Sequence, residues 1–268
     1  MLRLRQICIV APSLRPATQL AEICGVSICH RDPLVNEFGL ENALLAFGPT
    51  FVEFVAPIAD NTSATRFLAK HPQGGGYMVI LDCDELPVMR AHVESLGVRI
   101  AHASDLRNAS KQAATPELAQ ALRDYGGFAN IQLHPRDTGA TMLEFNWTEG
   151  GESIYGAYAP AGPRWQPFAR ATPDHILMAA ELQSPNPQVL ADKWSAILKR
   201  PTKRSNSHIA IELDVGAIHF VHGPHEKFTA LSVQVPDVAC VIDAARQADC
   251  AVSTSGFASS GLRFDCRA

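Results

Sequence analysis

Two glutamates each stand alone in an apolar segment of this 268-residue chain. Glu53 lies within FVEFVAP and Glu144 within MLEF. In a strand, either face would place these side chains beside a core, and a buried carboxylate needs a partner or a raised pKa. We therefore expect both glutamates to line a functional cup. The plain alternative is that each points outward from an antiparallel strand.

A second candidate set lies nearer the C-terminus. It consists of His175, His219 and Asp265, with Ala230 at the fourth corresponding position. Two imidazoles and one carboxylate suit a divalent transition metal that keeps open positions. A histidine on an apolar strand is more often a satisfied core residue, so a structural role is the competing interpretation of this set.

The turn His134-Pro135-Arg136-Asp137 precedes the strand of Glu144. Its functional interpretation makes His134 a proton shuttle and Arg136 an anchor for a substrate carboxylate. Its plain interpretation is turn chemistry alone. Aromatic residues would complete a binding cup by lining it, and those on the neighbouring strands are Phe51, Tyr77, Phe145 and Trp147.

The elements that must position these groups form a repeated pattern. A strand, a helix and then further strands recur four times, and a fixed repeat indicates repeated structural units. The fourth unit is short, so one strand there is missing or very small. We expect helix N-caps at Asp84 and Asp237. Gln6 and His175 are assigned the same place in their strands, and so are Glu53 and His219.

The predicted fold class is α+β, with tandem βαβββ units that form two paired open barrels. Residues 1–150 would form the first module. Residues 151–173 form a Pro-rich linker that packs onto a domain, since it contains Trp165 and Phe168. Residues 174–268 would form a second, shortened module.

Two segments together carry a family resemblance. Residues 51–81 give an apolar strand with Glu53, a Pro turn, a short helix, a Gly-rich turn and a second apolar strand; residues 133–145 add the strand of Glu144. This order resembles methylmalonyl-CoA epimerase and the wider glyoxalase, or vicinal oxygen chelate, superfamily. The resemblance implies one metal ligand on the first and last strand of each unit, at Gln6, Glu53, Met78 (or Tyr77 in a register one residue away) and Glu144. The superfamily usually has histidine where Gln6 and Met78 stand.

Two function classes follow from the resemblance. In the first, a divalent ion (Mn, Co, Fe, Ni or Zn) chelates a small oxo or hydroxy acid or its thioester, and a glutamate removes the alpha proton in an isomerase, epimerase or lyase reaction. In the second, the cup holds no metal and sequesters a small molecule. The missing histidines are what the second class predicts.

Bulk composition excludes other classes. A formal net charge of -4 and a pI near 6.2 argue against a nucleic-acid binder. Seven scattered cysteines without a CxxC pair suit reduced thiols, and we find no signal peptide or membrane-length apolar run. We expect a cytoplasmic protein, away from membranes, whose partner is a small molecule and which forms a homodimer.

Overall fold

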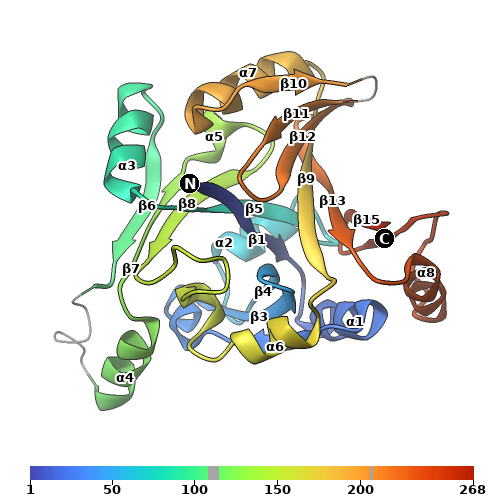
Figure 1. The fold of residues 1–268 in the computed structure, drawn as a ribbon, viewed down its shortest axis with the longest axis horizontal. Helices are drawn as coiled ribbons and strands as arrows, with labels where there is room; N and C mark the ends of the chain where they lie inside the picture. Colours follow the sequence, from blue (N-terminus) through green and yellow to red (C-terminus); the bar gives the residue numbers. More distant parts are fainter. Residues whose placement is uncertain (108–114, 206–207) are drawn as a thin grey trace.

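The computed structural model describes residues 1–107, 115–205 and 208–268, and its strands form two mixed sheets (Figure 1). The first sheet contains β1 (Leu2–Val10), β2 (Ser27–His30), β3 (Leu40–Phe47), β4 (Thr50–Pro57), β5 (Gly75–Cys83), β6 (Ile100–Asp105), β7 (Phe128–Leu133) and β8 (Met142–Thr148). The second contains β9 (Ile176–Ser184), β10 (Thr202–Arg204), β11 (Ile209–Glu212), β12 (Ala217–His222), β13 (Lys227–Gln234), β14 (Gly256–Ser259) and β15 (Leu262–Arg267).

The helices are short and lie between these strands. They are α1 (Arg15–Cys24), α2 (Ser63–Leu68), α3 (Leu86–Ser95), α4 (Pro116–Tyr125), α5 (Pro135–Thr138), α6 (Gln166–Ala171), α7 (Pro187–Leu198) and α8 (Val238–Gln247), with 3-10 turns η1 (Pro33–Phe38) and η3 (Ala159–Ala161). Asp237 caps α8 as predicted, because its carboxylate accepts the Cys240 N–H at 2.9 Å. The prediction for Asp84 is wrong: α3 begins after Glu85, and the Asp84 carboxylate binds the N-terminal amine at 2.6 Å.

The strand orders reveal the repeated unit. They are β2-β3-β4-β1-β5-β8-β7-β6 and β10-β11-β12-β9-β13-β15-β14. Each sheet joins two units through an antiparallel central pair, β1 with β5 and β9 with β13. Among the described residues, the fourth unit has β13, β14 and β15, and an isolated bridge between Val252 and Phe257 stands beside them. The predicted α+β class of tandem βαβββ units is confirmed, and the sheets are open.

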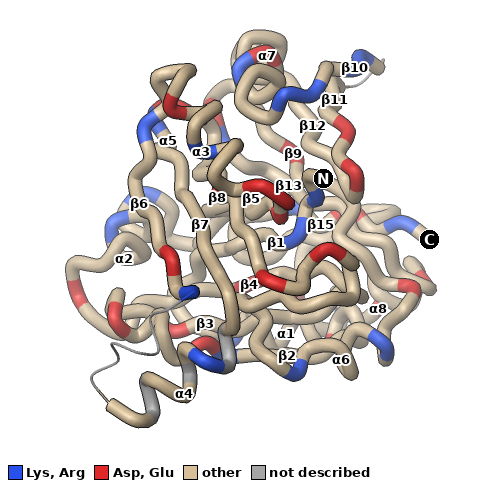
Figure 2. The backbone as a smooth tube through the Cα atoms, turned by 60° about the vertical axis from the view of Figure 1, so that its left-hand side comes forward, with Lys and Arg blue, Asp and Glu red and all other residues tan. Residues whose placement is uncertain are grey.

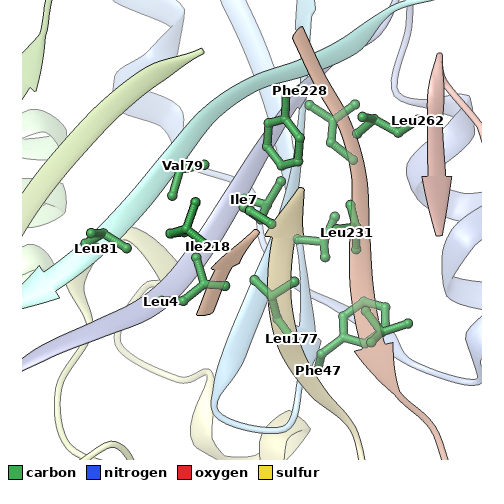
Figure 3. Packing of buried hydrophobic residues seen from close by; sticks show 14 of the residues in the cluster. Leu4, Ile7, Phe47, Val79, Leu81, Leu177, Ile218, Phe228, Leu231 and Leu262 are labelled. Carbon is green, nitrogen blue, oxygen red and sulfur yellow. The ribbon is translucent and has the colours of Figure 1, made fainter. Parts of the chain in front are cut away.

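One hydrophobic core joins the two sheets. Leu4 and Ile7 of β1 lie with Leu177 of β9 and Leu231 of β13 (Figure 3). Gly76 of β5 permits this approach, because an added Cβ there would stand 2.5 Å from the Phe228 ring. The predicted module boundaries stay a prediction, since the sheets are separate while the core is shared.

Alternation along the strands gives each sheet a second face, turned away from this core. We call this face the first cup in the sheet of β1–β8 and the second cup in the sheet of β9–β15. Acidic and basic residues are interspersed along the chain in Figure 2. In the described part of the chain, every helix is too short or too polar to cross a lipid bilayer.

Candidate functional site

The register of the central strand pairs shows which positions of the two cups are equivalent. Two register shifts enclose three residues in each module: Gln6–Cys8 in β1 and Ala179–Glu181 in β9. A bulge adds one residue to a strand and resets which side chains face the cup. Gln6 therefore corresponds to Ala179. The residues that pair with these segments in the neighbouring strands give three more equivalences: Glu53 with His219, Glu144 with Asp265, and Met78 with Ala230.

The predicted match of Gln6 with His175 is wrong. Gln6 corresponds to Ala179, and His175 stands four residues before Ala179, or about 13 Å along an extended chain. The His175 Nε2 hydrogen-bonds the Cys24 carbonyl oxygen at 2.9 Å, at the end of α1. His175 therefore ties the start of the second sheet to the first module, and the structure does not bring it together with His219 and Asp265.

Glu53 lies at the centre of the first cup and is 8% exposed. Its Oε2 accepts from Gln6 Nε2 at 2.8 Å, and its Oε1 accepts from Asn42 Nδ2 at 2.7 Å. Burial raises the pKa of Glu53, and hydrogen bonds from Asn42, Cys8 and Gln6 offset part of that rise. Burial also raises the pKa of the Cys8 thiol, with the Glu53 charge as the next cause. Cys8 is therefore a hydrogen-bond donor to Glu53 rather than a thiolate.

Glu144 faces the same cup from the other half of the sheet and is 5% exposed. Its Oε2 accepts from Gln132 Nε2 at 2.8 Å. Burial raises the pKa of Glu144 to about 7, against the stabilising hydrogen bonds of Gln132, Asn130 and Asn146, and the charge of Glu53 adds to the rise. Near neutral pH this carboxyl group is thus divided between its acid and base forms.

The segment between β8 and β9 covers part of the first cup, and we call residues 150–171 the cover. In Figure 1 this yellow-green to yellow stretch folds across β3 and β4. Tyr158 and Trp165 are fully buried there against Leu44 and Phe51. The Tyr158 hydroxyl donates to Gln6 Oε1 at 2.9 Å, so the cover joins the hydrogen-bond network of Glu53.

A buried ion pair anchors the start of the cover. Arg3 Nη2 lies 2.6 Å from Asp82 Oδ2, and both side chains are at most 5% exposed. Arg3 also donates to the carbonyl oxygens of Gly151 at 2.6 Å and Glu152 at 3.2 Å. The acidic and basic groups of the first cup are therefore closed off by the chain itself.

The other sequence-predicted residues separate into two groups. Tyr77 lies at a register shift beside Met78 and packs edge-on to Phe67, at the rim of the first cup. Phe51 faces that cup but is covered by Tyr158. Trp147 faces away from it, because its position differs from that of Glu144 by an odd number and successive side chains of a strand point to opposite faces. Phe145 lies in the shared core for the same reason.

The turn before β8 is a helix start rather than part of the cup. His134 caps α5, and its Nδ1 accepts the Arg136 N–H at 3.2 Å. Arg136 is exposed. The neighbouring Asp137 forms a two-pronged ion pair with Arg99. No hydrogen bond or ion pair joins His134 or Arg136 to Glu144, so the catalytic and anchoring roles of these two residues stay predictions.

The second cup contains a cavity of about 350 Å³. His219, Ser232, Glu212 and Arg267 line it with the apolar side chains of Met178 and its neighbours. Burial lowers the pKa of His219, and His208 and Arg267 lower it further. The neutral imidazole therefore predominates near pH 7.

Asp265 pairs in register with Ser232, which lines this cavity, but a cation binds the Asp265 carboxylate. Arg263 Nε donates to its Oδ1 at 2.7 Å, and Arg263 Nη2 donates to Glu181 Oε2 at 3.0 Å. These side chains are 47%, 31% and 20% exposed for Arg263, Asp265 and Glu181. These three charges of the second cup are thus paired in contact with water.

Neither donor set fits a divalent metal centre. In the first cup, amide N–H groups already bind both Glu53 oxygens, and the thioether of Met78 is too soft for a hard ion. In the second cup, two of the four positions are Ala179 and Ala230, which carry no donor atom. Within the residues that the structure describes, no group of three or more His, Cys, Asp or Glu side chains could hold a metal ion.

Sequence reasoning missed most of the polar groups that lie beside the predicted residues in the two cups. They are Arg5, Cys8, Asn42, Asn130, Gln132, Asn146 and Tyr158 in the first cup, and Glu181, Ser232 and Arg267 in the second. Some carried a usable signal: Asn146 is two residues from Glu144, and Asn130 is two from Gln132, so each pair shares a face. Tyr158 gave no such signal, because it reaches the cup from the cover.

Comparisons with known structures bear on the fold. The whole chain is similar to a mutant of 4-hydroxymandelate synthase from Streptomyces coelicolor, with a TM-score of 0.63, 10% identity and coverage of 98% of this chain and 91% of that chain. It is also similar to the Mn(II)-bound glyoxalase from Novosphingobium aromaticivorans, with a TM-score of 0.60, 14% identity and coverage of 99% and 82%. These likenesses confirm the predicted glyoxalase, or vicinal oxygen chelate, fold for both modules.

Methylmalonyl-CoA epimerase from Mycobacterium tuberculosis matches 55% of this chain and 88% of its own, at 19% identity and a TM-score of 0.43. We draw no argument from a match at that level. No protein-family model matches the chain, and no curated protein matches it.

Proposed function

We propose that the first cup is an acid–base site that acts on a small oxo or hydroxy acid. The observation that carries this proposal is Glu144, a buried carboxyl group with a pKa of about 7 that faces Glu53 across the cup. A base whose pKa lies near the working pH both accepts and returns a proton efficiently. Buried carboxylates with perturbed pKa values are also most common at functional sites.

The proposed reaction is proton transfer at the carbon next to the acid group. Ionised Glu144 would remove the alpha proton, and the amides of Gln132, Asn130 and Asn146 hold this carboxylate in place. Glu53, whose pKa is also raised, would return a proton from the other side. Two carboxylates on opposite halves of one cup suit an epimerase, and return of the proton to a different atom would give an isomerase.

Exchange of substrate alpha protons with D₂O, followed by NMR, tests this proposal. The panel should contain short 2-oxo and 2-hydroxy acids and their thioesters. We expect Glu144→Gln to slow exchange by about 10²- to 10⁴-fold, the usual contribution of a general base. Asp265→Asn, at the equivalent position of the second cup, is the matched control and should leave the rate unchanged. Equal loss in both variants, or no exchange with any acid, would falsify the proposal.

A second candidate is reversible binding of a small organic anion in the second cup. The cavity there supports it, because Arg267 supplies a positive charge while His219 and Ser232 supply hydrogen-bonding groups. Calorimetric titration with short mono- and dicarboxylates tests this candidate. Arg267→Ala should weaken binding about tenfold or more, since hydrogen bonds to charged groups are worth about 1.5–3 kcal/mol. The control Arg246→Ala, on the exposed ion pair of α8, should bind like the parent protein.

Assembly and location stay predictions of the sequence. A homodimer would give a sedimentation mass twice that of the 29.0 kDa chain. Neither proposal above depends on that outcome, because each cup is built within one chain.

A further inference from the structure

Arg5 is a buried cation without a full set of partners. The register shift in β1 between Leu4 and Gln6 turns Arg5 toward the first cup, where the side chain is 0% exposed. Its Nη1 donates to the Ile154 carbonyl oxygen of the cover at 2.6 Å. Its Nε and Nη2 make no hydrogen bond. Asp82, the acid that acts on Arg5 most strongly, is bound to Arg3 instead.

Three aromatic rings enclose this guanidinium group. Its Cζ lies 5.6 Å from the Phe51 ring centroid, 4.7 Å from that of Tyr158 and 5.3 Å from that of Trp165. The rings attract the cation but accept no conventional hydrogen bond. Burial lowers the pKa of Arg5 to about 10, so the group stays charged near pH 7. A buried charge without a partner is costly, and this box therefore favours an anion.

Two further side chains in this box have unused hydrogen-bonding atoms. The indole N–H of Trp165 has no acceptor, although the residue is 0% exposed. The Oδ1 of Asn146 has no donor, while its Nδ2 donates to the Tyr158 hydroxyl at 3.3 Å. The residues of the box thus have free N–H donors on Arg5 and Trp165 and a free acceptor on Asn146. Buried polar atoms normally have hydrogen-bond partners, so these free donors and this free acceptor indicate which groups a ligand of the box would carry.

We infer that the first cup binds a 2-hydroxy monocarboxylate, whose carboxylate accepts from Arg5 and Trp165 and whose hydroxyl donates to Asn146. A carboxylate matches the planar fork of donors on a guanidinium group. A neighbouring hydroxyl matches the free carbonyl oxygen of Asn146, whose amide group also hydrogen-bonds Glu144 and lowers the pKa of that carboxyl group. The inference rests on the proposed function only where it takes this acid as the substrate from which Glu144 removes a proton. Binding of the acid does not require turnover.

Entry into the box requires movement of the cover. Arg5, Tyr158 and Trp165 are each at most 1% exposed, and the Ile154 carbonyl oxygen occupies one donor of Arg5. We therefore expect the movement of the cover, rather than diffusion, to limit the rate of association.

Calorimetric titration of the full chain with three matched probes tests the inference. Glycolate carries both groups, acetate lacks the hydroxyl, and glycolamide lacks the charge. Glycolate should bind about fivefold more tightly than acetate, from one neutral hydrogen bond, and glycolamide should show no binding. Equal binding of glycolate and glycolamide, or no binding of glycolate, would overturn the inference.

Variants locate the bound probe. Trp165→Phe keeps the aromatic ring and removes only the N–H, so it should weaken glycolate and acetate alike, by about tenfold for a bond to a charged acceptor. Trp147→Phe, on the opposite face of the sheet, is the control and should change neither. Loss of binding in Arg267→Ala with full binding in Trp165→Phe would place the ligand in the second cup and overturn the inference.

The outcome is separable from that of the proposed function. Glycolate binding that depends on Trp165, together with no alpha-proton exchange for any acid, would keep the binding site and remove the catalytic role of Glu144. Alpha-proton exchange that depends on Glu144 but is unchanged in Trp165→Phe would keep the catalytic role of Glu144 and remove the binding site at Trp165.

Discussion

The two cups share one strand register but differ in what covers them. Glu53 and His219 occupy equivalent positions, and so do Glu144 and Asp265. The first cup is overlain by Tyr158 and Trp165, and its polar groups bind one another out of contact with water. The second cup keeps a cavity and exposed ion pairs. The same backbone therefore gives a closed polar network in one module and a solvated pocket in the other.

This difference shows where the electrostatics of the molecule come from. Strand position alone does not perturb a side chain, since Glu144 and Asp265 stand at the same point of their units. Burial raises the pKa of Glu144 to about 7, whereas Asp265 pairs with Arg263 in contact with solvent. Burial within the first cup thus turns an ordinary strand position into a perturbed one, and the surrounding amide side chains offset part of that rise in pKa.

The largest stability effect should come from truncating the buried tryptophan of the cover. Trp165→Ala deletes a fully buried ring and should destabilise the protein by about 3–5 kcal/mol in urea unfolding. His219→Ala, in the open cup, should cost about 1 kcal/mol or less, because His219 is only partly buried. Similar losses in the two variants would contradict the contrast between a closed and an open cup.

Removing one ion pair from each cup should give a somewhat smaller difference in the free energy of unfolding. Asp82→Asn leaves Arg3 buried without a counter-charge, and we expect a loss of about 3 kcal/mol. Asp265→Asn should change the free energy of unfolding by less than about 1 kcal/mol, because exposed pairs are worth little. Raising the salt concentration should affect only the second pair, since buried charges are poorly screened. Chemical denaturation at two salt concentrations measures both effects.

The pH dependence of stability should have opposite signs in the two cups. Glu144 has its pKa raised from 4.5 to about 7 in the folded protein, so its contribution is complete below pH 4.5 and is lost as the pH rises through 7. His219 has its pKa lowered from 6.5, so its contribution is present above pH 6.5 and is lost as the pH falls.

Paired variants measure these signs at several pH values between 4.5 and 8. The stability difference between the parent protein and Glu144→Gln should shrink as the pH rises, and that between the parent and His219→Gln should shrink as the pH falls. Two slopes of the same sign would show that the cups are not electrostatically distinct.

Local pattern was enough to predict the units of the fold. Apolar alternation marked the strands, Asp237 marked a helix start, and the short fourth unit was recognised from its length. The two glutamates could be singled out because a lone acid in an apolar strand is conspicuous. The same alternation could also have placed Trp147 on the opposite face from Glu144, since parity along a strand is a local property.

The amino-acid sequence thus determined the repeated units, the strands and the two acids of the first cup, because these depend on side-chain period and on short-range capping. Only the tertiary structure decided the register, which separated His175 from His219 and matched Gln6 with Ala179. Register depends on bulges and on partners in other strands, which the periodicity of one strand does not contain. The cover was likewise decided in three dimensions: Tyr158 reaches Gln6 across 152 positions of the chain, so the contact that closes the first cup has no local signal.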